Sequence, residues 1–169
     1  MSAVNLLDTK NMLNEKIKYD ALIIGLGKTG LSCVRYLSGK GLSLAIADNR
    51  EAPPELKKLK DECSEVSVYL GNFDPILLCS AKLIILSPGV SILDPAIQHA
   101  IENGVEVIGD IELFVRDTKV PIIAITGSNG KSTVATLITD MIRESGVKAE
   151  LGGNIGTPAL SLFERLQPE

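Results

Sequence analysis

Short apolar runs recur along this chain and are separated by amphipathic segments that carry most of the charged residues. The runs consist mainly of Leu, Ile, Val and Ala, a composition typical of parallel strands buried on both faces of a sheet. They predict strands at residues 21–24, 43–47, 66–70, 83–86 and 105–108. Because helical segments alternate with these strands, we expect an α/β fold with a Rossmann-like parallel sheet and right-handed crossovers.

Local patterns place helices between the strands. The segment that follows residue 30 has apolar residues at helical spacing. Asp74 and Asp94 each precede a proline, and this pair is typical of an N-cap and the first helical position. Helices are expected after residue 30 and at residues 54–59, 75–80, 95–102 and 111–115.

A second strand–loop–helix unit is expected to begin near Lys119. Residues 120–125 predict a buried strand, residues 132–144 a helix and residues 147–151 a further short strand. A last helix is expected to open at Thr157-Pro158. The predicted organisation is a flexible segment at residues 1–18, a Rossmann-like domain at 19–117 and the start of a second α/β domain at 118–169.

Composition narrows the functional classes. The chain has 169 residues, 45% hydrophobic and only 4% aromatic, and a formal net charge of −4 without a basic stripe. Nucleic-acid binding is therefore disfavoured. The N-terminal residues lack the apolar core of a signal peptide, and no run has the length of a membrane span. The three cysteines are far apart and fit no metal site or disulfide framework, which favours a reducing, cytoplasmic location.

A glycine fingerprint, G-L-G-K-T-G, follows the first predicted strand at residues 25–30. In such a turn Gly25 allows the tight bend, Gly27 the close approach of a ligand and Gly30 the packing of helix on strand. Asp48 follows eighteen residues after Gly30, near the spacing of a carboxylate that binds ribose. Taken alone, this pattern indicates NAD or FAD. Two alternatives are a turn that needs glycine only for packing, and an Asp48 that is a cap or a loop acid.

A second glycine-bearing turn, T-G-S-N-G-K-S-T, lies between the predicted strand at 120–125 and the predicted helix at 132–144. Backbone N–H groups at the start of a helix, together with the helix dipole, favour a phosphate there. Lys131 is placed to reach the outer phosphates of a nucleotide, and Ser132 to offer a hydroxyl to Mg²⁺. Ile125 stands where the usual P-loop pattern has a glycine, so the alternative is an ordinary turn with a solvated lysine.

Several motifs occur together in a fixed order: G-L-G-K-T-G-L-S, I-A-D-N-R, L-S-P-G-V, G-D-I-E-L-F, I-A-I-T-G-S-N-G-K-S-T and G-G-N-I-G-T-P-A-L. In this combination the chain resembles the amino-terminal part of the Mur ligases of peptidoglycan synthesis, from about Tyr19 onward. G-D-I-E-L-F and the N-I-G segment point to the D-glutamate-adding member of that family. The alternatives are another member of the family, or a NAD-binding or nucleotide-sensing module.

The resemblance implies that the first glycine turn holds the UDP part of a substrate rather than a dinucleotide. It places Lys28 and Thr29 at the diphosphate, although the family often has an apolar residue at the position of Lys28. The remaining implied substrate-binding residues are Asp48, Asn49 and Arg50 around the uracil and ribose, Gly89 at the uridine, and Asn154 at the phosphate or sugar.

The resemblance further implies an ATP-dependent ligase that forms an amide bond. ATP would phosphorylate the carboxylate of UDP-N-acetylmuramoyl-L-alanine, and the amine of D-glutamate would attack the acyl phosphate. Lys131 would be catalytic, with Mg²⁺ held at Ser132. The implied ATP-binding residues are Gly127, Asn129, Gly130, Lys131, Ser132 and Thr133.

The family continues beyond the part that this chain resembles, through most of a central ATP-binding domain and a carboxyl-terminal domain. We therefore expect this chain to be an inactive amino-terminal piece that binds the UDP substrate. A parent enzyme is expected to be a monomer. Residues 120–169 are expected to pack against the first domain, to associate with another copy of the chain through exposed edges, or to be locally mobile.

Overall fold

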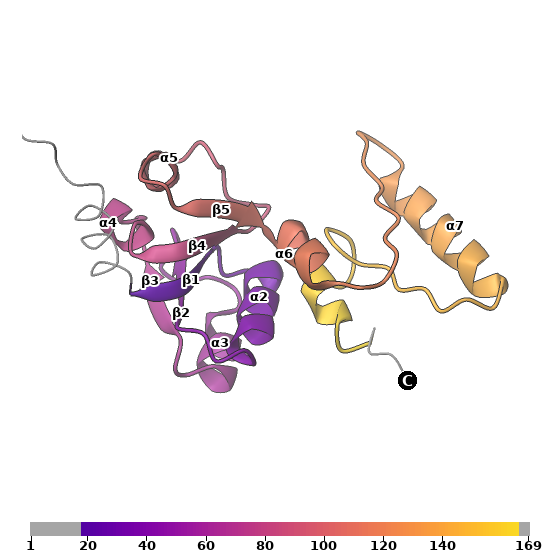
Figure 1. Cartoon of the computed structure of the whole chain (residues 1–169), viewed down its shortest axis with the longest axis horizontal. Coiled ribbons are helices and arrows are strands. Elements are labelled where there is room, and N and C mark those ends of the chain that lie inside the picture. Colours follow the sequence, from indigo (N-terminus) through magenta and orange to yellow (C-terminus); the bar gives the residue numbers. More distant parts are fainter. Residues whose placement is uncertain (1–17, 166–169) are drawn as a thin grey trace, which may run out of the picture. The chain divides into compact units, whose positions relative to one another are not determined.

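The computed structural model describes residues 18–165 and contains one parallel sheet flanked by helices (Figure 1). The strands lie in the order β3-β2-β1-β4-β5, and the prediction of an α/β fold with a parallel sheet is confirmed. Between residues 18 and 117 the elements are, in chain order, β1 (Tyr19–Ile24), α2 (Lys28–Ser38), β2 (Leu44–Asp48), α3 (Leu56–Glu62), β3 (Ser67–Leu70), α4 (Pro75–Leu78), β4 (Ala81–Leu86), α5 (Pro95–Glu102), β5 (Glu106–Gly109) and α6 (Asp110–Asp117).

The central strand β1 carries the core. Leu22, Ile23 and Ile24 are fully buried, because β1 pairs with β2 on one side and β4 on the other. Figure 1 shows α2 and α3 on one face of this sheet and α4 and α5 on the other. Leu22 and Ile24 pack with Leu78 of α4 and Ile97 of α5. The continuous apolar runs of the sequence thus correspond to strands that are covered on both faces.

The two predicted N-caps are confirmed. An Asp74 carboxylate oxygen accepts a hydrogen bond from the Ile76 amide, and Asp94 accepts one from Ala96, each over 2.9 Å. Each cap satisfies an N–H group that has no partner inside its helix. The caps fix where α4 and α5 begin, and so where the chain turns back toward β4 and β5.

The contacts between Cα atoms divide the chain between Asp110 and Ile111, within α6 and ahead of the boundary at residue 117 that the sequence suggests. The second unit contains the rest of α6, the helix α7 (Lys131–Glu144) and a short 3₁₀ helix, η1 (Ala159–Leu162). The rings of Phe114 and Phe163 pack with their centroids 4.9 Å apart. The predicted flexible segment 1–18 lies outside the described residues except for Lys18.

Two predicted strands are absent from the second unit as the structure describes it. Residues 120–125 are not in a strand, and residues 147–151 are not either. The sheet-like pairing in this unit is a single bridge between Gly152 and Thr157. A parallel strand needs a neighbouring strand for its backbone hydrogen bonds, and residues 111–165 supply none to the apolar run. Its side chains Ile122 and Ile123 are therefore 46% and 60% exposed.

Candidate functional site

Three loops lie at one edge of the sheet because their strands are parallel neighbours. The glycine turn at 25–30 follows β1, residues 48–50 close β2, and residues 87–89 follow β4. In open α/β sheets, ligands bind at the carboxyl ends of strands, where successive crossovers lie on opposite faces. The strand order puts this point between β1 and β4, and the three loops therefore lie at the same end of the sheet.

The glycine turn owes its shape to two of its three glycines. Gly25 has a φ of +99°, which side-chain-bearing residues rarely adopt. A Cβ on Gly30 would lie 1.9 Å from the carbonyl oxygen of Gly25, so α2 can approach β1 only without a side chain there. Nothing lies within 4 Å of a Cβ built on Gly27. The glycine fingerprint predicts the close approach of a ligand at Gly27, and the structure has open space there.

The N-terminus of α2 faces this space with its first turn. Gly27 is the N-cap and supplies no side-chain acceptor, and the first turn of the helix contains no acidic residue. The N–H groups at this end therefore have no side-chain cap, and the helix dipole favours an anion. Of the two residues assigned to a diphosphate, Lys28 is exposed and Thr29 is half-buried. Both belong to this first turn.

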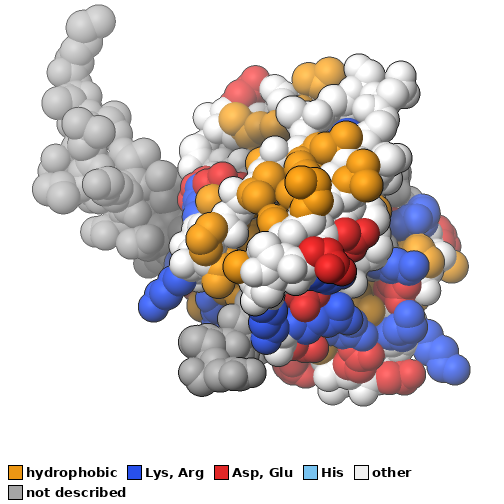
Figure 2. Space-filling model, turned by 90° about the vertical axis from the view of Figure 1, so that its right-hand side faces the viewer, with side chains coloured by type: hydrophobic (Ala, Val, Ile, Leu, Met, Phe, Trp, Pro, Cys, Tyr) orange, Lys and Arg blue, Asp and Glu red, His pale blue; other side chains and the backbone are white. Residues whose placement is uncertain are grey.

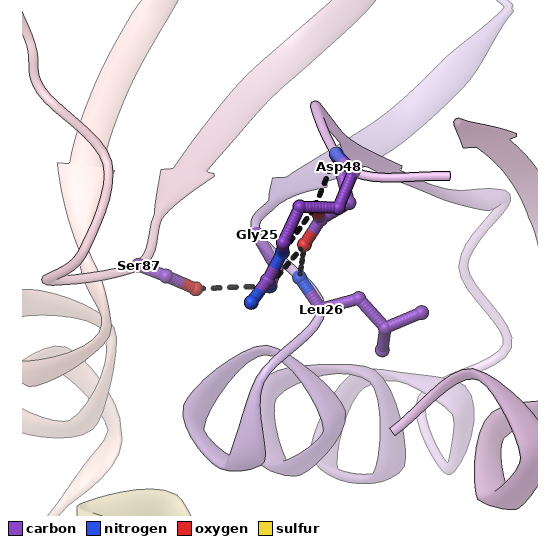
Figure 3. A network of polar contacts seen from close by, with 5 residues as sticks. Gly25, Leu26, Asp48 and Ser87 are labelled. Atoms are coloured by element: carbon purple, nitrogen blue, oxygen red, sulfur yellow. Dashed lines mark hydrogen bonds and ion pairs between the residues drawn. The ribbon is translucent and has the colours of Figure 1, made fainter. Parts of the chain in front are cut away.

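Asp48 lies at the end of β2 and is 2% exposed. Its Oδ2 accepts a 2.6 Å hydrogen bond from the amide of Leu26, inside the glycine turn (Figure 3). Arg50 donates three more: its amide and Nε to Oδ1, over 2.9 and 2.8 Å, and Nη2 to Oδ2 over 2.7 Å. The carboxylate thus links the end of β2 to the loop that follows the neighbouring strand β1.

The charge state of Asp48 follows from these contacts. Burial by itself raises the pKa of the carboxyl, but the guanidinium of Arg50 and the amides of Leu26 and Arg50 outweigh it. The pKa of Asp48 lies below its usual value, and that of Arg50 lies above its own because of the same pairing. The pair is therefore fully ionised at neutral pH.

Ser87 holds the other side of the glycine turn. Its hydroxyl donates a 3.1 Å hydrogen bond to the carbonyl oxygen of Gly25 (Figure 3). Two of the residues that the family resemblance assigns to the uridine, Asn49 and Gly89, are exposed. No atom lies within 4 Å of a Cβ built on Gly89. The structure therefore brings Asp48, Asn49 and Arg50 to the same sheet edge as Lys28 and Thr29.

The second predicted site lies in the other unit. Gly130 is the N-cap of α7 with a φ of +74°, and Lys131 begins the helix. The ammonium of Lys131 donates hydrogen bonds to the carbonyl oxygens of Gly127 and Ser128 in its own loop. Asn129, Ser132 and Thr133 are exposed at the same helix start. No acidic residue lies in the first turn of α7, so this end of the helix fits an anion.

Asn154 belongs to neither of these groups. Asn154 is exposed in the second unit, in the turn closed by the Gly153 amide and the carbonyl of Thr157, whereas the other substrate residues belong to the first unit. Ser132 is the only residue assigned to a metal, and the part of the chain described here contains no cluster of three His, Cys, Asp or Glu side chains that could hold one.

The sequence did not predict the contacts of Leu26 with Asp48 or of Asp48 with Arg50. The glycine pattern predicts the turn but does not indicate which backbone amide of the turn bonds to the carboxylate of Asp48. The spacing D-x-R was available as an indication, because a side chain two residues along can fold back on the acid at a strand end. Only the structure shows that the acid bonds to the turn and the arginine together.

Comparison with known proteins adds independent information. A UDP-N-acetylmuramoylalanine--D-glutamate ligase of Marinobacter nauticus is 55% identical over 144 residues, which cover 85% of this chain and 32% of that protein. The same ligase of Nitrosococcus oceani is 46% identical, over 94% of this chain and 36% of the relative. The chain thus spans about a third of the length of these relatives.

Comparison with solved structures supports the fold alone. UDP-N-acetylmuramate-alanine ligase MurC of Thermotoga maritima superposes with a TM-score of 0.51 at 16% identity, over 76% of this chain and 30% of that one.

The family described as "Mur ligase MurD-like, N-terminal domain" matches residues 19–109, which include the sheet, the glycine turn and Asp48. The chain therefore belongs to the MurD-like Mur ligases and carries their amino-terminal domain.

Proposed function

We propose that this chain contributes the UDP-binding domain to a ligase that adds D-glutamate to UDP-N-acetylmuramoyl-L-alanine. The observation that carries the proposal is the single edge of the sheet where the glycine turn, residues 48–50 and residues 87–89 meet. Relatives with 46–55% identity bear the name of that ligase and supply the choice of substrate.

At this edge the residues have chemically distinct tasks. The uncapped amides of the first turn of α2, together with Thr29 and Lys28, suit the diphosphate because they offer donors and positive charge. Asn49 and Arg50 offer side-chain donors to the nucleoside, and the open face of Gly89 leaves room for a ring. Asp48 lies with Asn49 and Arg50 at the end of β2. Asn154, which belongs to the second unit, is proposed separately as a contact for a phosphate or a sugar.

The second unit would hold ATP at the N-terminus of α7. Gly127, Asn129, Gly130 and Thr133 would surround the phosphates through the backbone. Lys131, whose ammonium already lies over the loop, would offset negative charge on the phosphoryl group in transfer. Mg²⁺ would bind the hydroxyl of Ser132, with nucleotide oxygens and water as its remaining ligands. We also propose a reducing, cytoplasmic location, since the three cysteines are far apart in the sequence and fit no disulfide framework.

The proposal is tested by titrating the chain with UDP-N-acetylmuramoyl-L-alanine, and separately with NAD, while following backbone amides by NMR. We expect the UDP compound alone to shift the amides of Lys28, Thr29, Asn49, Arg50 and Gly89. Shifts of these amides with NAD, and none with the UDP compound, would replace the ligase proposal with a dinucleotide-binding module.

A further inference from the structure

We propose that Asp48 is a positioning residue that fixes the glycine turn and aims Arg50, rather than a residue that binds the ribose of a ligand. The inference deepens the proposed function, because it concerns what the same site presents to a nucleotide. It rests on the network of Gly25, Leu26, Asp48, Arg50 and Ser87 (Figure 3).

The acceptor capacity of Asp48 is already used. A carboxylate has about four lone-pair sites for hydrogen bonds. Oδ1 accepts from the Arg50 amide and Nε, and Oδ2 accepts from Leu26 and Nη2 of Arg50. The side chain is also buried. A ribose hydroxyl could bond to Asp48 only by displacing the amide of the turn or the guanidinium, so direct ribose binding is disfavoured.

The turn is held from both neighbouring strands at consecutive residues. From β2, Asp48 accepts from the amide of Leu26, and from β4, Ser87 donates to the carbonyl of Gly25. A Cβ on Gly25 would lie 2.9 Å from Cβ of Ser87, so the backbone and this side chain are in close contact. The two side chains together constrain the peptide group between Gly25 and Leu26. The next residue is Gly27, beside which a ligand has room.

Arg50 gains direction from the same carboxylate. Its guanidinium is held through Nε and Nη2 in a two-point pair, yet its side chain remains 52% exposed. The donors that do not face Asp48 remain for an acceptor on a ligand. The edge therefore presents a fixed cation where a dinucleotide-binding sheet presents a carboxylate to ribose. A carbonyl oxygen or an anionic group of the ligand fits this better than a ribose diol.

The test uses the whole 169-residue chain with the variants Asp48→Asn, Arg50→Gln and the double variant. Glu62→Gln is the matched control, because Glu62 accepts a similar two-point pair from Arg35 at 2.7 Å, away from the turn. The first readout needs no ligand. It is the hydrogen exchange of the Leu26 amide and the pH dependence of its proton shift, both by NMR. The second is the affinity for UDP by calorimetry, with NAD as the comparison.

In the ligand-free chain we expect Asp48→Asn to speed exchange at Leu26 about tenfold or more, since the bond to a charged acceptor is lost. In the wild type the Leu26 shift should titrate with a midpoint below that of an ordinary aspartate. Arg50→Gln should move this midpoint upward, and Glu62→Gln should leave it unchanged. Unchanged exchange in Asp48→Asn, or an unchanged midpoint in Arg50→Gln, would overturn the inference. The second variant decides the matter even if the first fails to fold.

With UDP, each single variant should weaken binding, and the double variant should lose less affinity than the sum of the two single losses, because Asp48 acts in part through Arg50. Fully additive losses would show that Asp48 acts independently of Arg50 and would overturn the inference that it aims this side chain. A wild-type chain that does not bind UDP would count against the proposed function. The Leu26 readouts would still decide whether Asp48 positions the turn.

Discussion

At the scale of single residues, the glycines of the turn differ in whether they have room for a side chain. Gly30 packs against the backbone of Gly25, whereas Gly27 has open space beside it. Both belong to one fingerprint in the sequence, which does not distinguish a glycine required for packing from one required for access. The contrast allows folding and ligand binding to be separated by experiment.

We expect Gly30→Ala to lower the free energy of unfolding by about 3 kcal/mol, because a Cβ would overlap a carbonyl oxygen that cannot move independently. Gly27→Ala should cost about 1 kcal/mol at most, the usual effect of alanine at an N-cap. Urea denaturation of both variants measures the difference. Equal losses would show that the close approach of α2 to β1 is not what Gly30 provides.

A second prediction concerns pH. Since the pKa of Asp48 is lower in the folded chain, its contribution to stability is complete above the ordinary value near 3.8 and is lost as the pH falls through the lowered pKa. At pH 7 we expect Asp48→Asn to cost about 2 kcal/mol. The difference from the wild type in urea denaturation should shrink below pH 3.8. A constant difference down to pH 2 would contradict the pairing.

At the scale of elements, the sequence predicted best what is local. The caps of α4 and α5 depend on residues close in the sequence, and the apolar runs of the first unit can be recognised from the same range; the structure confirms both. The predicted strand at 120–125 is wrong because its formation depends on strands that residues 111–165 do not contain. The bond between Asp48 and Leu26 joins residues far apart in the sequence, so no local pattern could specify it.

The helix α7 has an apolar face that is exposed. Val134, Leu137 and Met141 recur at helical spacing on one side and are 45%, 56% and 71% exposed. Figure 2 shows that hydrophobic side chains gather into a patch on the face it views. Contiguous apolar surface of this kind favours association.

We expect the chain to self-associate through this face as its concentration rises, and Leu137→Gln with Met141→Lys to reduce the association constant at least about tenfold, because apolar area is no longer removed from water. Sedimentation velocity over a concentration series measures it. Ile76→Gln is the control, since Ile76 is 81% exposed on α4 of the first unit. An equal effect of the control would assign the association to general surface hydrophobicity.

At the scale of the whole molecule, the two units differ in how their backbone N–H and C=O groups are hydrogen-bonded. The first unit has a five-stranded sheet around β1. The second has helices, turns and one bridge in the residues described. Local stability follows the density of buried, hydrogen-bonded backbone. The chain spans about a third of the length of its relatives. It combines a unit with many backbone hydrogen bonds between strands and a unit with few.

Hydrogen exchange followed by mass spectrometry should show this difference. We expect amides at residues 122–126 to exchange at least about a hundredfold faster than those of β1, because these residues are not in a strand. The measurement is made at a concentration where the chain is a proven monomer. Equally slow exchange in both segments would mean that residues 122–126 are protected by hydrogen bonds other than those of the structure.

The fixed backbone of the glycine turn also limits how the chain could escape a compound that binds over it. Such a compound would contact peptide groups whose geometry depends on Gly25, with its positive φ, and on Gly30, which has no room for a side chain. Substitutions at these two positions would destabilise the fold before they weakened the binding of the compound. Of the three glycines, Gly27 alone can accept a methyl group, and there the methyl group would enter the space that the proposed ligand needs.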